Sequence, residues 1–148
     1  MVQWREGMAI DGGVIDDDHR HLISLINDYE ELMAKGFDQG AILKVLQSLK
    51  FYTVYHFTRE EAAQRAANYP EAETHAAEHK RLIDCVDYAM LLLGREIAGD
   101  RRDELKGQVA RLLNNWLVSH IIKYDIPMRP YVRNMRLFMG KQAPISTV

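Results

Sequence analysis

Apolar residues recur at the spacing of one helix face through four long segments, and no stretch of alternating β-branched residues competes with this pattern. The segments cover about residues 19–35, 38–67, 71–93 and 100–126. Glycine and proline residues separate them, as is typical of helix ends. Since short connections favour antiparallel neighbours, the pattern predicts an all-α fold, an up-down-up-down four-helix bundle.

The residues before the first segment have a different pattern. Trp4, Ile10 and Ile15 are apolar anchors spaced along about residues 1–18, so we expect an extended arm ahead of the bundle. By length the chain is expected to form one domain. Its expected parts are an arm at about 1–18, a bundle at about 19–126 and a short tail at about 127–148.

Several residues mark the expected ends of helices. Three consecutive aspartates, 16–18, place carboxylates near a positive helix N-terminus, and we interpret them as helix-start chemistry rather than metal ligands. Asp38 is expected to cap the second helix. Pro127 and Pro130 are expected to close the fourth helix, because proline lacks the amide hydrogen that a helix interior uses. A short tail helix can follow at about 131–139.

Composition narrows the class of protein. A formal net charge of -2 gives no electrostatic reason to expect binding to nucleic acid or to anionic membranes. No apolar run approaches the ~20 residues that span a bilayer, and the first residues lack the apolar centre of a signal peptide. The single cysteine, Cys85, excludes an intrachain disulfide framework and suits a reducing compartment. We therefore expect a soluble, cytoplasmic domain.

Residues that can bind a metal ion stand on the apolar stripes of the predicted helices. His56 and Glu60 are four residues apart, and so are His75 and His79, so each pair shares one helix face. His19 opens the first apolar segment. Burying an imidazole or a carboxylate is costly unless a charged or polar group receives it, and a metal ion is one such receiver.

The fourth helix carries His120 and Asp125. Five residues on a regular α-helix rotate by about 140°, so these two side chains would not share a face. A π-type widening, or a loosened last turn before Pro127, would bring both toward the bundle interior. We therefore expect a local irregularity in this helix if both residues belong to one site.

Each candidate alone has a simpler interpretation, because a single helical histidine is usually a surface residue or a hydrogen-bonded core residue. His21 stays in that class, since it lies about 200° round the helix from His19. Cys85 is interpreted as a small core residue. The other five of the six histidines fall on the apolar stripes of four helices, some with carboxylates at ligand spacing. Together they favour a metal site.

The order and spacing of five motifs resemble those of the hemerythrins, and most closely the bacterial single-domain forms, the bacteriohemerythrins. The motifs are Ile15-Asp16-x-x-His19-x-x-Leu22, His56-Phe57-x-x-Glu60-Glu61, Tyr69-Pro70, His75-x-x-x-His79 and Trp116-Leu117-x-x-His120-Ile121-x-x-x-Asp125. The likeness covers about residues 4–131, and all seven expected ligand positions are filled in the expected order.

The resemblance implies a non-haem di-iron site in which two carboxylates bridge the irons alongside an oxo or hydroxo group. One iron would take His75, His79 and His120, the other His19 and His56, and the bridges would be Glu60 and Asp125. Counting the three bridging oxygens at each ion, the first iron is complete at about six ligands and the second keeps one open position for a small ligand.

The family's oxygen pocket implies that Trp116, Leu117 and Ile121 serve as apolar walls, a role compatible with ordinary core packing. One position departs from the family pattern. Many bacterial members have Met four residues after the bridging Glu60, and this chain has Gln64. We interpret Gln64 as exposed to water at the bundle end. The alternative is a hydrogen bond near the site, which would make the pocket less dry.

The function implied by the resemblance is reversible dioxygen binding for storage, transport or delivery, with azide or nitric oxide as other small ligands, rather than enzyme activity. Its two carboxylates are fewer than the four of ferritin-like sites, which favours binding oxygen over cleaving it. One rival is oxygen or redox sensing, although only about twenty residues follow Asp125 to serve as output. Another is a peroxide or nitric oxide scavenging enzyme, for which the sequence shows no electron supply.

Overall fold

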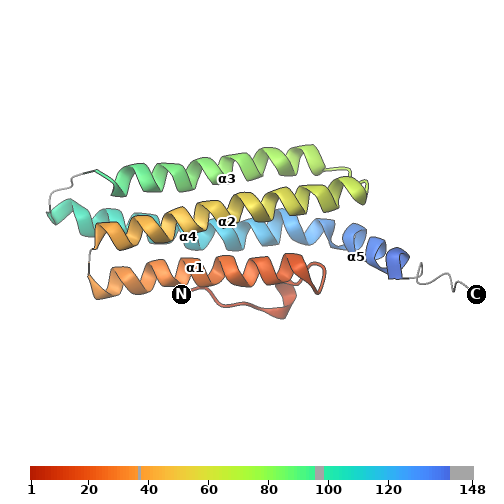
Figure 1. Cartoon of the computed structure of the whole chain (residues 1–148), viewed down its shortest axis with the longest axis horizontal. Coiled ribbons are helices and arrows are strands. Elements are labelled where there is room, and N and C mark those ends of the chain that lie inside the picture. Colours follow the sequence, from red (N-terminus) through yellow and green to blue (C-terminus); the bar gives the residue numbers. More distant parts are fainter. Residues whose placement is uncertain (37, 96–98, 141–148) are drawn as a thin grey trace, which may run out of the picture.

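The computed structural model describes residues 1–36, 38–95 and 99–140. Within these residues the chain forms four long helices and no strand. They are α1 (Val14–Lys35), α2 (Gln39–Ala66), α3 (Ala72–Leu93) and α4 (Gly99–His120). Successive helices run in opposite directions, so the predicted all-α, up-down-up-down four-helix bundle is confirmed (Figure 1).

The ends of α2 follow from local chemistry. The Asp38 side chain accepts a hydrogen bond from the Ala41 amide at 3.0 Å, which confirms it as the N-cap. After Ala66 the chain turns at Asn68, whose φ of 51° lies in the left-handed region. Pro70 follows and disfavours a helical conformation for the residue before it. The turn therefore brings α3 back alongside α2 (Figure 1).

The start of α1 differs from the prediction, because the helix begins at residue 14 rather than near 19. The Asp11 carboxylate accepts hydrogen bonds from the amides of Gly13 at 2.8 Å and Asp16 at 3.3 Å, which satisfies donors at the helix N-terminus. The aspartate run does not supply this cap. Asp16 instead accepts hydrogen bonds from the amides of Ile10 at 2.6 Å and Gly12 at 2.7 Å, and so ties the arm to α1.

The prediction that prolines close the last bundle helix is wrong. The chain stays helical from α4 through a short π-helix, η2 (Ile121–Asp125), into α5 (Ile126–Gly140), which includes the predicted tail helix. Pro127 is the second residue after η2, at a point where the π-turn already interrupts the regular i→i−4 hydrogen bonds that a proline would break. Pro130 lies inside α5, and the buried side chains of Met128 and Val132 hold this helix against the arm and α1.

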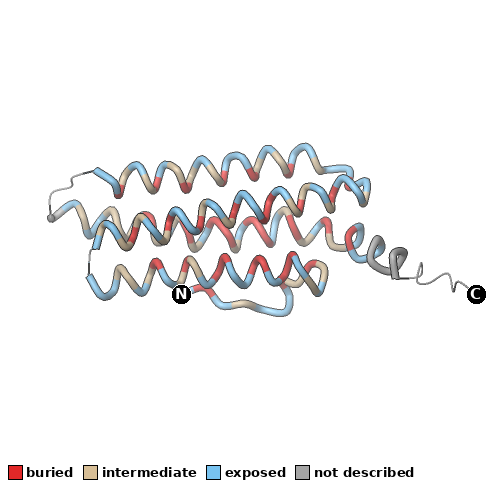
Figure 2. Tube along the Cα trace, in the orientation of Figure 1, coloured by how far each residue is buried: buried red, intermediate tan, exposed pale blue. Residues whose placement is uncertain are grey.

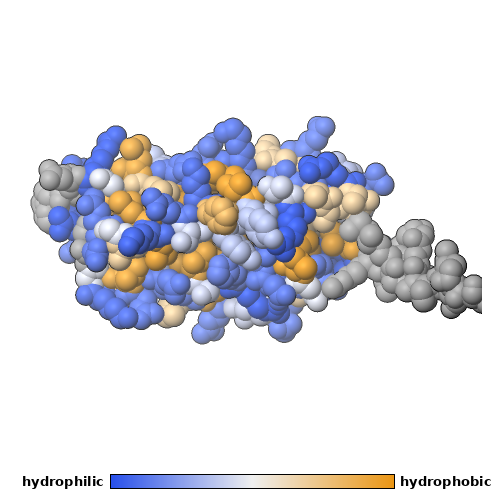
Figure 3. Space-filling model, in the orientation of Figure 1, coloured by the Kyte–Doolittle hydropathy of each residue, from blue (hydrophilic) through white to orange (hydrophobic). Residues whose placement is uncertain are grey.

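The apolar stripes of the four helices face one another, and buried positions line the inside of the bundle (Figure 2). On the face shown in Figure 3, hydrophilic residues cover most of the surface, with hydrophobic residues scattered among them. Within the described residues, no helix is long and apolar enough to cross a membrane. The buried apolar residues between the helices supply the surroundings of the site.

Candidate metal centre

The seven predicted ligands meet inside one half of the bundle, and each is exposed by 2% or less. The antiparallel order places the first halves of α1 and α3 beside the second halves of α2 and α4 (Figure 1). These halves contribute His19 from α1, His56 and Glu60 from α2, His75 and His79 from α3, His120 from α4 and Asp125 from η2.

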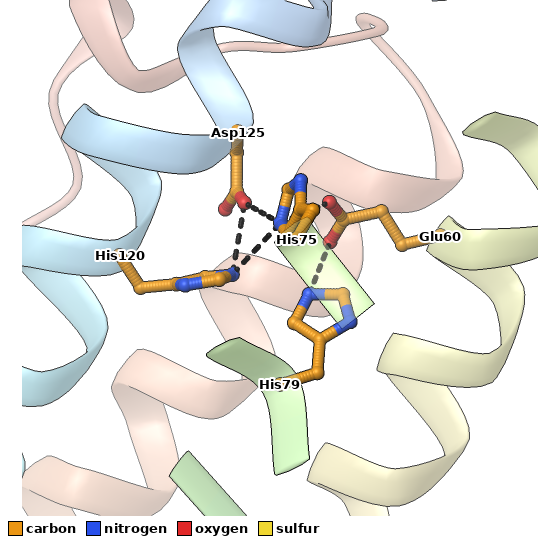
Figure 4. A group of neighbouring side chains, drawn as sticks. All are labelled: Glu60, His75, His79, His120 and Asp125. Carbon is orange, nitrogen blue, oxygen red and sulfur yellow. Dashed lines mark hydrogen bonds and ion pairs between the residues drawn. The ribbon is translucent and has the colours of Figure 1, made fainter. Parts of the chain in front are cut away.

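The seven residues form two overlapping groups, within each of which the potential ligand atoms all lie within 4.8 Å of one another. The larger group is Glu60, His75, His79, His120 and Asp125, and the smaller is His19, His56 and Glu60. Figure 4 shows the side chains of the larger group converging from different helices. Glu60 belongs to both groups, so the two sets of ligands are adjacent.

Both carboxylates face both groups. Glu60 Oε1 lies 3.3 Å from His75 Nε2, and Glu60 Oε2 lies 3.1 Å from His56 Nε2. Asp125 Oδ1 lies 3.1 Å from His75 Nε2, and Asp125 Oδ2 lies 3.2 Å from His19 Nε2. Each carboxylate therefore spans the space between the groups, as a bridging ligand would.

The π-helix η2 explains how Asp125 reaches the site, and the predicted widening of the helix after His120 is confirmed. In a π-turn the hydrogen bonds close from residue i to residue i+5, as the Ile126 amide does to the Ile121 carbonyl. Residues five apart then come onto one face. His120 Nε2 and Asp125 Oδ1 consequently lie only 3.0 Å apart.

Several polar atoms of these side chains are buried without a well-formed hydrogen bond. They are both ring nitrogens of His19, Nε2 of His56 and His79, Nδ1 of His120, Oε2 of Glu60 and both carboxylate oxygens of Asp125. Leaving such atoms unpaired in a protein interior is costly. Imidazole nitrogens with carboxylate oxygens form a donor set that suits iron and related transition ions. The residues present therefore fit a metal site.

The family model of the hemerythrin HHE cation binding domain matches residues 13–125. The chain belongs to the hemerythrin family. All seven converging side chains lie within the matched residues, and Asp125 is the last of them.

Curated relatives agree with this assignment. The bacteriohemerythrin of Methylococcus capsulatus is 32% identical over 114 residues, 76% of this chain and 82% of that protein. A bacteriohemerythrin of Pseudomonas aeruginosa is 32% identical over 123 residues, 82% of this chain and 75% of that protein. A solved structure of wild-type hemerythrin, 24% identical, has a TM-score of 0.73 and matches 90% of this chain and 98% of that chain. This last likeness supports the hemerythrin fold alone.

Burial and neighbouring charges perturb the ionisation of the site in this hemerythrin-family chain. Burial raises the pKa of Glu60 well above its usual range, and the negative charge of Asp125 adds to the effect. Burial also acts to raise the pKa of Asp125, but nearby imidazoles, led by His120, outweigh it and hold that pKa well below its usual range. Burial lowers the pKa of His79 to about 2, so its ring stays neutral and its lone pair stays available to a metal.

Two carboxylates outside the seven orient histidines of the site, and the sequence prediction missed both. Asp18 Oδ2 lies 3.3 Å from His56 Nδ1, and the Tyr52 hydroxyl donates to Asp18 Oδ1 at 2.7 Å. Burial opposes ionisation of Asp18, but these hydrogen bonds prevail and lower its pKa. Glu61 Oε1 lies 2.9 Å from His79 Nδ1. The sequence did contain one signal for these two residues, because Asp18 directly precedes the predicted ligand His19 and Glu61 directly follows Glu60.

The prediction that Gln64 is exposed to water is wrong, because its side chain is fully buried. Its amide nitrogen lies 3.1 Å from Glu60 Oε1, 2.8 Å from His75 Nδ1 and 3.3 Å from Met128 Sδ. The prediction failed because α5 continues past Pro127 and covers this end of the bundle with Met128. The alternative interpretation, a hydrogen bond near the site, is the observed one.

Apolar side chains surround the histidines, and the predicted walls Trp116, Leu117 and Ile121 are all buried. The indole N–H of Trp116 is already bonded, since it donates to the Leu82 carbonyl at 3.1 Å. Phe57 is a further wall that the prediction omitted. Its ring stacks on His79 with centroids 3.7 Å apart and planes 6° from parallel.

His21 and Cys85, which the sequence does not predict to bind metal, lie outside the site. His21 is exposed, with its ring 4.2 Å from that of Tyr52 between centroids. Cys85 is half-buried and packs against the main hydrophobic core. Neither belongs to the two candidate metal-binding groups formed by the described residues.

Proposed function

We propose that this chain binds dioxygen reversibly at a carboxylate-bridged pair of non-haem iron ions, for oxygen storage, transport or delivery. Membership of the hemerythrin family supports an oxygen-binding role, and the likeness to proteins named bacteriohemerythrin supports it further. The observation that carries the proposal is the pair of overlapping ligand groups that share Glu60. One shared carboxylate between two sets of imidazoles suits two adjacent ions better than one.

The distribution of the side chains supports an assignment of ligands. His75, His79 and His120 would hold one iron, and His19 and His56 the other. Glu60 and Asp125 would bridge the ions with an oxo or hydroxo group, since each carboxylate faces both groups. The iron pair would supply a place for dioxygen at the ion that has fewer protein ligands.

The surrounding residues support carriage of oxygen by orienting ligands and excluding water. Asp18 and Glu61 accept hydrogen bonds from histidines and so fix the ring nitrogens that face the metals. Phe57, Leu117 and Ile121 are buried, and the Phe57 ring lies against the rings of His79 and His120. Apolar walls oppose the loss of bound oxygen as a charged species, because an ion needs solvent or protons to leave, although the Gln64 amide adds one polar group near the site.

The test begins with iron content and an absorption spectrum. Full-length protein prepared with ample iron should hold about two iron atoms per chain, because seven ligands exceed the needs of one octahedral ion. The reduced protein should be nearly colourless without oxygen and should gain visible absorption in air. Lowering the oxygen pressure should reverse most of that change. Azide should bind the oxidised protein at the same open position, and nitric oxide the reduced protein.

Other outcomes would replace the proposal. An iron content near one would contradict the paired site, as would a preference for zinc when iron is ample. A direct and irreversible oxidation in air, with no reversible stage, would exclude oxygen carriage and favour redox sensing. Sustained turnover of peroxide or nitric oxide with an added electron donor would favour a scavenging enzyme.

A further inference from the structure

An open groove runs between α3 and α4 and consists of two adjoining cavities. One, of about 600 Å³, lies beside the metal centre, because His120 and Trp116 are among its lining residues. The other, of about 420 Å³, lies toward the opposite end of the two helices, where Leu92 and Val109 line it. Four residues line both cavities, which are therefore continuous: Arg81, Cys85, Gln108 and Leu112. Cavities of this size suit a small organic molecule.

The end of the groove beside the metal centre is polar and positively charged. Arg111 and Lys123 line it, and within the described part of the chain neither has an ion pair. The acidic residue of this cavity, Glu78, already accepts two hydrogen bonds from Arg81, at 2.6 and 2.8 Å. Neutral side chains that can hydrogen-bond a ligand also line this end, namely Asn115 and Ser119. The cations therefore remain free to bind an oxyanion.

The other end of the groove is apolar. Most residues that line the second cavity have apolar side chains: Cys85, Tyr88, Ala89, Leu92, Val109 and Leu112. The acidic residue there, Asp84, accepts a hydrogen bond from Lys80 at 3.0 Å. Tyr88 is exposed by 58%, so part of this apolar lining faces water. A hydrocarbon group that covered it would remove apolar surface from water, which is favourable.

The order of the two ends defines the shape of a matching ligand. Arg111 adjoins Leu112 on α4, and Leu112 lines both cavities, so the cation stands where the polar end meets the apolar end. On α3 the apolar end extends from Cys85 to Leu92, a rise of about 10 Å. An extended hydrocarbon chain of about eight to ten carbon atoms has this length. The ligand is therefore elongated, with one anionic end and one apolar end.

We propose that the groove between α3 and α4 binds a single-chain carboxylate. Its carboxylate pairs with the Arg111 guanidinium, whose planar fork matches two carboxylate oxygens. Its hydrocarbon chain lies along the apolar end, against Leu112 and Leu92. No metal ion takes part in these contacts, so this binding site and the proposed oxygen-binding function are tested separately.

The first test is calorimetric titration of the full-length protein with decanoate, below the concentration at which decanoate forms micelles. One decanoate should bind per chain, with a Kd of about 1 mM or below, as ligands of this size typically reach. In the series hexanoate, octanoate and decanoate, each added methylene should tighten binding by about twofold to fourfold. Decyltrimethylammonium has the same chain length with the opposite charge and should not bind.

The second test locates the ligand. Cys85 is the single cysteine of the chain, is half-buried and lines both cavities. Its alkylation by iodoacetamide therefore reports on the groove alone. Saturating decanoate should slow that alkylation several-fold, because the bound chain covers the thiol. An equal concentration of decyltrimethylammonium should leave the rate unchanged.

One variant tests the anionic end. Arg111→Gln should weaken decanoate binding by about tenfold or more, because it removes a charge-assisted hydrogen bond, and should leave the dependence on chain length unchanged. Lys44→Gln is the matched control, since Lys44 is exposed on α2 and lines neither cavity. It removes the same charge and should leave the affinity unchanged.

Several outcomes would overturn this binding site. They are an absence of decanoate binding, uptake of many molecules per chain, equal binding of the cationic amphiphile, and an unchanged rate of Cys85 alkylation. Equal losses in Arg111→Gln and Lys44→Gln would also exclude a specific carboxylate site. If the chain forms a dimer that hides Cys85 and that decanoate does not dissociate, a second copy occupies the groove instead. If Arg111→Gln does not fold, the chain-length series and the protection of Cys85 still decide the question. Iron content and the oxygen-dependent spectrum decide the proposed function independently.

Discussion

The two halves of the bundle are built from the same four helices, but one interior is apolar and the other contains imidazoles and carboxylates. The half formed by the end of α1, the start of α2, the end of α3 and the start of α4 is filled by apolar side chains. Its fully buried members include Tyr29, Ile42, Leu46 and Leu93. In the other half, the same stripes carry five imidazoles and two carboxylates, with no exposed fraction above 2%. Neighbouring layers of one core therefore differ in chemistry, and the described backbone of the site half also contains the π-helix η2, which brings Asp125 to the site.

This contrast separates stability from function. Apolar burial stabilises the first half whether or not a metal is present, at about 25 cal/mol per Å² of apolar surface removed from water. The second half buries polar atoms that lack partners, which destabilises the metal-free fold. A metal ion bound by these atoms would make their contribution to the stability of the fold favourable. Substitutions in the two halves should therefore differ in how their effects depend on metal.

The largest effect is expected for Glu60→Gln, which replaces the carboxylate shared by both ligand groups. An amide cannot bridge two cations as an anion does, so iron content should fall from about two per chain to one or less. The metal-free variant should instead melt at a higher temperature, because it no longer buries that carboxyl group. Metal analysis and thermal melts with and without iron measure both effects.

Glu73→Gln is the control for that experiment, since Glu73 is exposed on α3. It should leave iron content and both melting temperatures unchanged. Two irons retained in Glu60→Gln would contradict the shared role of Glu60, and a less stable metal-free variant would contradict the contrast between the halves.

Leu46→Ala tests the apolar half and has the next largest effect. Truncating a fully buried leucine should lower the free energy of unfolding by about 2–5 kcal/mol. The loss should be the same with and without iron, because Leu46 belongs to the apolar core cluster and not to the ligand groups. Chemical denaturation of both forms measures it. A reduced iron content in the folded variant would show that the halves are coupled.

The sequence predicted the parts of the molecule that depend on repeated local pattern. The helical period and short connections gave the four-helix bundle, and the i,i+4 spacing on two helices placed His56 with Glu60 and His75 with His79. The five-residue interval between His120 and Asp125 predicted a widened turn, because a regular α-helix could not bring both to one site. These features follow from helix geometry alone.

The sequence did not predict features that depend on tertiary packing. Gln64 is buried because α5 continues past Pro127 and places Met128 beside it, and no local signal shows that continuation. Asp18 was grouped with two neighbouring aspartates as a helix-start residue, although only its position on α1 directs it toward His56. The amides at the N-terminus of α1 donate instead to Asp11, which lies in the arm. In each case a distant element decides the role.

Asp18→Asn should have a smaller effect than a change of ligand, since Asp18 acts on the site through His56. An amide holds the His56 tautomer less firmly than a carboxylate, so affinity for the ion held by His19 and His56 should fall by about tenfold. Asp17→Asn is the matched control, because Asp17 is exposed on the same helix. Competition with a chelator measures both affinities. Equal affinities in the two variants would leave Asp18 with a purely structural contact to Tyr52.

Leu117→Ala should have the smallest effect on metal binding and the most specific effect on function. Leu117 is buried in α4 three residues before His120, on the boundary between the apolar interior and the site. Its truncation should leave two irons in place, because no ligand is lost, but should admit water and shorten the lifetime of the oxygenated form several-fold. Leu113→Ala, one turn earlier on α4 and equally buried, should destabilise the fold by a similar amount with an unchanged lifetime. Decay of the visible absorption in air-saturated buffer provides the comparison. If both variants shorten the lifetime equally, general loosening of the bundle rather than an opened pocket controls the loss of oxygen.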